Sequence, residues 1–324
     1  MCHRQDRLLR EYWKSLPSRR TDGQNGAGRG LGARCYLEAM EDTPRQVAAG
    51  FPEMWTPVYR KYKLFFDCAA KLAPITTEMI RTPVEGPLLQ IIGRMAAAAA
   101  NTHGALLTLV LNGYGHDAMK LARSLFEIEI NILRLKAHPE EIEDFMGYHF
   151  IRQKQLYDMF SDDQKERVPQ ERFDRMMSDY NSVLGLFTRG RDKTRPRNEW
   201  CSESLYKRAK EAGPQYFDLY RMFYGQASSM HHLDFAGIAA HSDADMLADM
   251  APSWACLDDA LVATGCALRS ISHYDEIANL GFKERIESGP SADYVAAVKS
   301  LRPPASDGCR GFRDFGVFDP VESL

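Results

Sequence analysis

The sequence predicts an all-α protein, built as a single multi-helix bundle with a disordered N-terminal leader and an irregular C-terminal tail. Two observations predict this class. From about Trp55 onward apolar residues recur at helical spacing, and no convincing run alternates apolar and polar residues as a half-buried strand would. A chain of 324 residues with 44% hydrophobic content is also long enough to bury a proper core. We therefore expect a leader over 1–50, a helical domain over 51–302 and a tail over 303–324.

The leader is predicted from its composition. Residues 15–50 contain the stretch SRRTDGQNGAGRGLGAR, which is rich in Gly and Arg and has no apolar period. Such a segment buries too little apolar surface to offset the entropy lost on ordering. Met40 comes soon after this stretch, which suggests the hypothesis that translation starts there.

Nine helices are expected along the domain. They span residues 55–72, 88–111, 117–137, 140–160, 164–186, 200–212, 214–231, 253–277 and 292–301. The first is expected to end at Pro74, because proline removes a helical hydrogen bond and clashes with the preceding turn. The second is rich in alanine, the strongest helix former. NGYGHD at 112–117 then supplies glycines for a helix stop and Asp117 for the next start, which predicts a tight αα-hairpin.

The later boundaries also depend on proline. The helix over 117–137 is apolar almost all round, which predicts a central position. Pro169 sits inside the helix expected over 164–186, so that helix is expected to start later. Pro214 and Pro252 stand where helices begin, a position at which the missing N–H costs no helical hydrogen bond.

Charge and cysteine usage exclude several classes of protein. Forty-four acidic and 41 basic residues leave a net charge of -3, so the whole molecule is not an electrostatic partner for nucleic acid or an anionic membrane. The longest apolar run, 96–111, is interrupted and falls short of the roughly 20 residues that cross a bilayer. The seven cysteines are scattered and form no CxxC pair, which fits a reducing cytoplasm better than a disulfide framework or zinc knuckle. We expect a soluble cytoplasmic protein without a membrane partner.

The helix over 117–137 carries one polar stripe. At 100° per residue, four polar side chains fall within about 80° of one another: Arg123, Glu127, Asn131 and Arg134. One interpretation is a carboxylate held by arginine inside the bundle. The other is a stripe that faces water, in which Arg123 and Glu127 form an ordinary i,i+4 pair worth a few tenths of a kcal/mol, about 0.2–0.5. Glu129, on the opposite flank, is a second candidate for a buried acid, one that an arginine of a neighbouring helix would satisfy.

The helix that begins at Pro214 has a similar geometry. Five side chains project within about 60° of one mean direction, with His232 at the edge: Phe217, Arg221, Tyr224, Ser228 and His231. Arg221, Ser228 and His231 are therefore expected to line one cleft. The alternative is that the aromatic residues belong to the core and that His231 caps the carbonyl end of the helix, where the dipole favours a cation.

Metal and nucleophile chemistry are poorly supported. Metal sites in helical bundles place Glu and His at ExxH spacing, which occurs nowhere in the chain. The other possible ligands fall on a segment expected to be a loop: His231, Asp234, His241, Asp243 and Asp245. The GxSxG turn and the GxxxxGK[ST] loop are also missing from the sequence. We therefore expect no metal, no cofactor, no serine acyl transfer and no P-loop chemistry.

Three stretches resemble a known family. HDAMKLARSLFEIEINIL at 116–133, Trp200, and YFDLYRMFYGQASSMHH at 216–232 resemble a bacterial all-helical family, domain-of-unknown-function family 5677, over about residues 90–275. The matching residues are Arg123, Glu127, Tyr220, Arg221, Ser228 and His231. This resemblance implies a helical fold and no established activity.

The same helices more distantly resemble the HEPN superfamily of helical bundles, many of which are metal-independent ribonucleases of phage-defence and toxin systems. That resemblance implies a histidine general acid or base at His231, charge stabilisation by Arg221 and orientation by Glu127. Those ribonucleases use an Arg followed four to six residues later by His, whereas nine residues separate Arg221 from His231 here.

Two functions remain open. The favoured one is a binding or regulatory module, in which the Arg, Glu and His residues lock helices together or bind a small polar ligand. The alternative is a HEPN-like endoribonuclease that binds RNA through the alternating basic residues of 189–197, with Trp200 stacking on a base; such a loop is also compatible with a plain solvated surface. A homodimer stays open.

The candidate residues follow from these two hypotheses. Catalytic candidates are Glu127, Arg221 and His231. Binding candidates are Arg123, Asn131, Tyr220, Tyr224, Ser228, Arg195, Arg197 and Trp200.

Overall fold

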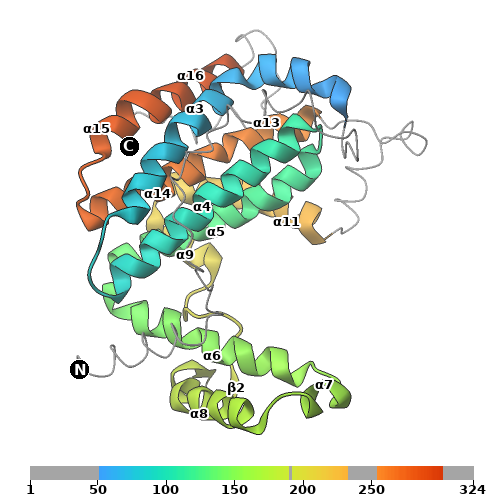
Figure 1. Cartoon of the computed structure of the whole chain (residues 1–324), viewed down its shortest axis with the longest axis vertical. Helices are drawn as coiled ribbons and strands as arrows, with labels where there is room; N and C mark the ends of the chain where they lie inside the picture. Colours follow the sequence, from blue (N-terminus) through green and yellow to red (C-terminus); the bar gives the residue numbers. More distant parts are fainter. Residues whose placement is uncertain (1–50, 190–191, 233–253, 302–324) are drawn as a thin grey trace, which may run out of the picture. The chain divides into compact units, whose positions relative to one another are not determined.

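The computed structural model describes residues 51–189, 192–232 and 254–301 (Figure 1). Apart from one two-stranded sheet, the regular elements of these residues are helices, which confirms the predicted all-α class. The described residues divide into two compact units, 135–207 and 51–134 with 208–301, and each is considered by itself. The predicted leader and tail lie outside the described residues, and the predicted extent of one domain over 51–302 stays a prediction.

The larger unit begins with three helices. They are α3 (Trp55–Arg81), which follows the short helix η2 (Pro52–Met54), α4 (Pro87–Leu111) and α5 (Gly115–Ala137). A turn joins α4 to α5 with Gly113 at φ 80°, a conformation that glycine adopts without a steric penalty. The predicted αα-hairpin is therefore present within two residues of its expected bounds.

The expectation that Pro74 ends the first helix is wrong. Helix α3 continues through Pro74 to Arg81, and its one non-helical residue is Tyr62, a dozen positions earlier. The stretch after Pro74 buries Ile75 and Met79, and α3 packs against α16. Burial of this apolar face outweighs the hydrogen bond that proline removes.

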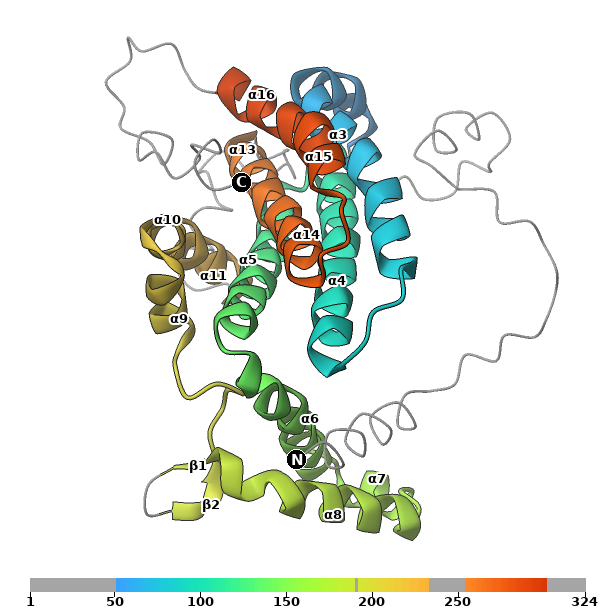
Figure 2. The ribbon, with the colours of Figure 1, turned by 90° about the vertical axis from the view of Figure 1, so that its left-hand side faces the viewer.

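Two groups of helices complete the larger unit. The first group comprises α9 (Leu205–Ala212), α10 (Pro214–Leu219), η4 (Tyr220–Tyr224) and α11 (Gly225–His232). The second comprises α13 (Trp254–Val262), α14 (Thr264–Ala278), α15 (Lys283–Ile286), η5 (Glu287–Ser291) and α16 (Ala292–Leu301). Figure 2 shows α14 lying against α4, with α3 beside α4 and α16 packed on α3.

The helix expected over 253–277 is in fact two helices. The Tyr294 hydroxyl on α16 donates to the Val262 carbonyl at 3.1 Å, and the Cys266 N–H bonds to the Ala263 carbonyl at 2.9 Å. In an uninterrupted α-helix the Cys266 N–H would instead bond to Val262. The Val262 carbonyl thus accepts a hydrogen bond from Tyr294, 32 residues later in the sequence, at the point where α13 ends and α14 begins.

The break leaves Gly265 tightly enclosed. A Cβ at this position would lie 2.8 Å from Tyr294 Cζ and 3.0 Å from Arg269 Nη1. We expect Gly265→Ala to lower the free energy of unfolding by about 1–3 kcal/mol, because overpacking outweighs the better helix propensity of alanine. Urea denaturation would measure this, with Gly104→Ala as control. Gly104 is exposed on α4 with nothing within 4 Å of its Cβ position. The control should be stabilising by about 0.5–1 kcal/mol, and an equal effect of both substitutions would contradict the prediction.

The smaller unit consists mainly of two packed helices. Helix α6 (Ile142–Asp158) follows the short η3 (Pro139–Glu141), and α8 (Gln170–Phe187) follows the short α7 (Asp162–Glu166). Pro169 is the N-cap of α8, which confirms the later start expected there. Helices α6 and α8 share a small core of Phe150, Ile151, Val183 and Phe187.

A short antiparallel hairpin follows α8. Strand β1 (Thr188–Arg189) pairs with β2 (Asp192–Pro196), with Thr188 opposite Pro196. This hairpin occupies the stretch that was expected to be a basic loop. After it, the Arg197 N–H bonds to the Phe187 carbonyl at 2.7 Å, which fixes the end of the hairpin against the end of α8.

Candidate functional site

The two distant stretches of the predicted site meet in the larger unit, and they meet at Tyr224. The Tyr224 hydroxyl, on η4, donates to Glu127 Oε1 at 2.7 Å and accepts from Arg123 Nε at 3.1 Å. The same Arg123 nitrogen lies 3.1 Å from Glu127 Oε1, and its guanidinium lies 5.1 Å from the Tyr224 ring centre. Three side chains thus form a closed polar cluster between α5 and η4.

The tyrosine of this cluster is held as a neutral donor. Burial and the hydrogen bond to Glu127 raise the pKa of Tyr224 to about 12. Its ring also stacks on Tyr220, with centroids 5.2 Å apart and planes inclined by 16°. The position of the Tyr224 ring is therefore fixed from two directions, by hydrogen bonds at the hydroxyl and by packing at the ring.

The other two residues of the polar stripe contact α9. Asn131 Oδ1 accepts a hydrogen bond from Arg208, and Arg134 Nη1 lies 2.6 Å from Glu211 Oε2. The stripe on α5 therefore faces other elements of the unit, which favours the interpretation of polar groups paired inside the fold. The Arg123–Glu127 pair has the i,i+4 spacing of the solvent-facing alternative, with Glu127 still 40% exposed.

His231 does not join this cluster. Both His231 and His232 are exposed, with their ring centres 5.1 Å apart, and no hydrogen bond links His231 to Glu127 among the described residues. The reason lies in η4, which is a π-helix. A π-helical turn holds one residue more than an α-helical turn, so the residues after it are shifted by one position around the axis. The projection that assumed an uninterrupted α-helix was therefore one residue out of step beyond Tyr224.

A solvent-open hollow lies along η4 and α11. Its volume is about 500 Å³, and the side chains that line it include Tyr220, Arg221, Tyr224, Ser228, Ser229 and His232. Four of these were predicted as site residues. His232 takes the place expected for His231, as the shift at the π-helix requires.

Arg197, which follows the hairpin, and Trp200 belong to the smaller unit and are built into its structure. Arg197 donates to the carbonyls of Trp200, at 2.5 Å, and Glu199, at 3.1 Å, and its guanidinium lies 4.9 Å from the Phe187 ring centre. Trp200 is only 7% exposed and packs edge-on against Phe145. Neither side chain is presented as a surface for a stacking base or a phosphate. The side chain of Arg195 lies outside the described residues.

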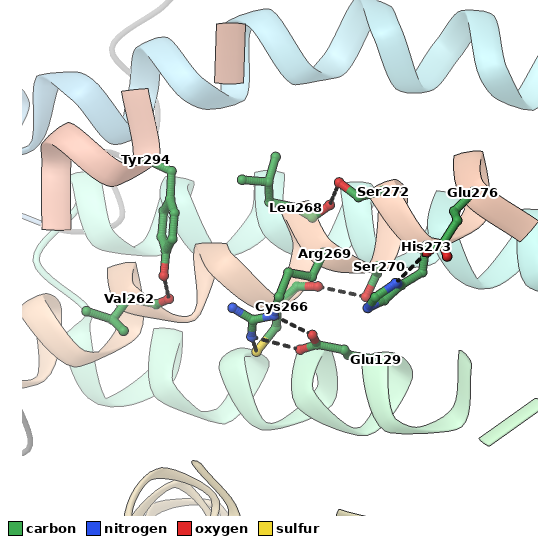
Figure 3. A network of polar contacts seen from close by, with 10 residues as sticks. All are labelled: Glu129, Val262, Cys266, Leu268, Arg269, Ser270, Ser272, His273, Glu276 and Tyr294. Carbon is green, nitrogen blue, oxygen red and sulfur yellow. Dashed lines mark hydrogen bonds and ion pairs between the residues drawn. The ribbon is translucent and has the colours of Figure 1, made fainter. Parts of the chain in front are cut away.

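A buried ion pair links α5 to α14 (Figure 3). Arg269 donates to both oxygens of Glu129, from Nε at 2.5 Å and from Nη2 at 3.0 Å. Glu129 is fully buried, and the Arg269 side chain is 12% exposed. Fork-to-fork contacts of this kind are both strong and directional. The expectation that an arginine of a neighbouring helix satisfies Glu129 is confirmed.

Two ionisable side chains next to the pair, Cys266 and Tyr216, stay protonated. Burial, together with the nearby Glu129 carboxylate, raises the pKa of the Cys266 thiol well above its ordinary value. The same causes, in the same order, raise the pKa of Tyr216, whose ring centre lies 5.7 Å from the Arg269 guanidinium. Cys266 is consequently a neutral, unreactive thiol.

Sequence reasoning missed three polar partners: Arg269, His103 and Cys256. Arg269 is the one Arg or Lys between positions 254 and 278, and its isolation in an apolar stretch was the available signal for a buried acid. His103 Nε2 lies 3.1 Å from Thr264 Oγ1 in the core, and Cys256 Sγ lies 3.2 Å from His116 Nδ1. Nothing in the local pattern pairs these residues, since their partners are more than a hundred positions away.

The possible metal ligands named from the sequence fall partly inside and partly outside the described residues. Within the described ranges, no group of three or more His, Cys, Asp or Glu side chains is placed to hold a metal ion. Asp234, His241, Asp243 and Asp245 lie outside the described residues. Over the same ranges, no helix combines the length and the apolar composition needed to span a membrane, and the cytoplasmic location stays a prediction.

Fold and site together define an all-helical protein with a polar cluster between α5 and η4. Residues 89–247, which contain both elements, match the model of the family of unknown function DUF5677. This part of the chain therefore belongs to that family, and the predicted resemblance is confirmed. Neither the curated proteins nor the solved structures give a match. The more distant resemblance to HEPN bundles stays a prediction.

Proposed function

We propose that the protein is a binding module whose ligand site is the hollow along η4 and α11. The observation that carries the proposal is the convergence of Tyr220, Arg221, Tyr224 and Ser228 on one open hollow. Sites for small molecules are concave and combine apolar walls with a few placed polar groups. The tyrosine pair supplies the wall, and the arginine and serine supply the polar groups.

The polar cluster behind the hollow gives it a fixed shape. Arg123 and Glu127 hold the Tyr224 hydroxyl from the central helix α5, and Tyr224 in turn holds the Tyr220 ring by stacking. In this proposal Arg123 and Glu127 position the site and do not contact the ligand. A preorganised wall loses less entropy on binding than a mobile one. A π-helix inside an otherwise α-helical stretch is also frequent at functional sites.

A filling substitution tests the proposal. Saturation-transfer NMR would detect millimolar binding of small polar probes, namely ribose, glycine, adenosine, phenol and 5′-AMP. We expect at least one probe to give a signal that Ser228→Phe abolishes, because the larger ring occupies the hollow. The control is Ser182→Phe, at an exposed serine on α8, which should leave the signal unchanged. Signals from no probe, or equal signals from both variants, would contradict a ligand site here.

A ribonuclease is the second candidate, and one observation favours it. Arg221 and His232 line the same hollow, and an arginine with a histidine can stabilise and protonate a phosphoryl group without metal. Incubation with RNA in EDTA, beside His231→Ala and His232→Ala, separates the two functions. Cleavage lost only in His232→Ala would make the hollow catalytic, whereas equal traces from all three proteins would be contamination.

A further inference from the structure

The described side chains that line the hollow include basic residues and no acidic ones. Arg221 is exposed, and its guanidinium lies 5.8 Å from the Phe217 ring centre. In the part of the chain that the structure describes, no carboxylate pairs with Arg221, and no Asp or Glu lines the hollow. His232, a second nitrogen-bearing side chain, lines it as well. This basic lining contrasts with the net charge of -3 on the whole chain.

The carboxylate of the polar cluster does not cancel this charge. Glu127 accepts the Tyr224 hydroxyl at 2.7 Å and lies 3.1 Å from the Arg123 guanidinium. Its charge is therefore matched by Arg123, on its own helix. Among the described residues, Arg221 beside the tyrosine pair forms no ion pair with a carboxylate.

The remaining polar groups are hydroxyl donors. Ser228 and Ser229 are half-buried on α11 and line the hollow beside Arg221 and His232. Guanidinium, imidazole and hydroxyl groups together are the donors that bind oxyanions. The stacked Tyr220 and Tyr224 rings add an apolar wall for the uncharged part of a ligand.

We propose that the hollow binds a small molecule that carries an oxyanion, a phosphate or a carboxylate, with its apolar part against the tyrosine pair. This inference rests on the proposed function, whose ligand it specifies by charge. The volume of about 500 Å³ suits a metabolite-sized molecule. Arg221 is the residue that selects the anion.

Matched probes test the charge directly. Titration by NMR would compare phenyl phosphate with phenol, which share the ring and differ in the anion, and would include benzoate and inorganic phosphate as separate arms. We expect phenyl phosphate to bind at least about fivefold more tightly than phenol, as one charge-assisted hydrogen bond in an open site would give. Benzoate reports whether a carboxylate serves as well, and inorganic phosphate whether the anion alone suffices.

Substitution of the arginine completes the test. Arg221→Gln should remove most of the preference for phenyl phosphate over phenol. The control is Arg285→Gln, at an exposed arginine that is paired with Glu78 and does not line the hollow. This control removes the same charge from the chain, so it should keep the preference.

The outcomes separate the inference from the proposed function. Equal binding of phenol and phenyl phosphate would overturn the proposed anion and leave a neutral ligand site in place. A preference for phenyl phosphate that Arg221→Gln keeps would overturn the assignment of anion binding to Arg221. The proposed anion would also be overturned if no anionic probe binds while a neutral probe binds to the wild type and not to Ser228→Phe. The hollow would then be a site for a neutral ligand. No binding of any probe would overturn both.

Discussion

Replacement of Glu129 by leucine is expected to lower the free energy of unfolding by about 3–5 kcal/mol. Arg269 donates to both carboxylate oxygens of Glu129, which is fully buried between α5 and α14. Without Glu129 the guanidinium keeps its charge in a site with almost no water. Urea denaturation followed by circular dichroism would measure the loss.

Two further variants decide whether the charge is the cause. Glu129→Leu combined with Arg269→Met should recover most of the lost stability, because the uncompensated cation is then gone. Glu211→Gln, which removes the 53% exposed partner of Arg134, should cost less than about 1 kcal/mol. A double variant no more stable than Glu129→Leu would mean that packing volume, and not charge, explains the effect.

Acid is expected to destabilise the protein through His103. This imidazole is 2% exposed and contacts the Thr264 hydroxyl, and burial lowers its pKa from 6.5 to about 4. His103 is therefore protonated near pH 6.5 in the unfolded chain but only near pH 4 in the folded chain. Stability contributed by neutral His103 is complete above pH 6.5 and is lost as pH falls through this window, by about 3 kcal/mol in all.

Comparison with a variant isolates this histidine. His103→Gln keeps a polar partner for Thr264 but does not titrate, so its stability should fall less between pH 7 and pH 4.5. Carboxylates titrate alike in both proteins, and the difference between the two curves removes their contribution. Parallel curves would show that His103 is not the group that senses acid here.

The helices were largely predictable because their signals are local. An alanine-rich run predicts α4, glycines predict the turn after it, and Pro214 predicts the start of α10. The errors occur where contacts with residues distant in the sequence determine where a helix ends. Pro74 lies inside α3 because the turn after it is buried, and the hydroxyl of Tyr294 accompanies the break after Val262.

The site was predictable in part for the same reason. Arg123, Glu127 and Tyr224 stand on the polar faces that helical spacing predicts, and they do meet. The choice of histidine was not predictable, because no residue type marks the π-helix between α10 and α11. The Arg269 ion pair was predictable only in part. A lone cation in an apolar stretch indicates that a buried acid is present, but the sequence does not identify Glu129 as that acid.

The wide turn at Tyr220–Tyr224 holds one residue more than an α-helical turn. Deleting one residue there would let it close to an ordinary α-helical turn, and His232 and the residues after it would keep their orientation relative to the residues before the turn. Closing the turn without a deletion would instead bring His231 to the hollow, with no side chain altered. Relatives that differ by a single-residue gap in this turn would therefore still present the same downstream surface to a ligand.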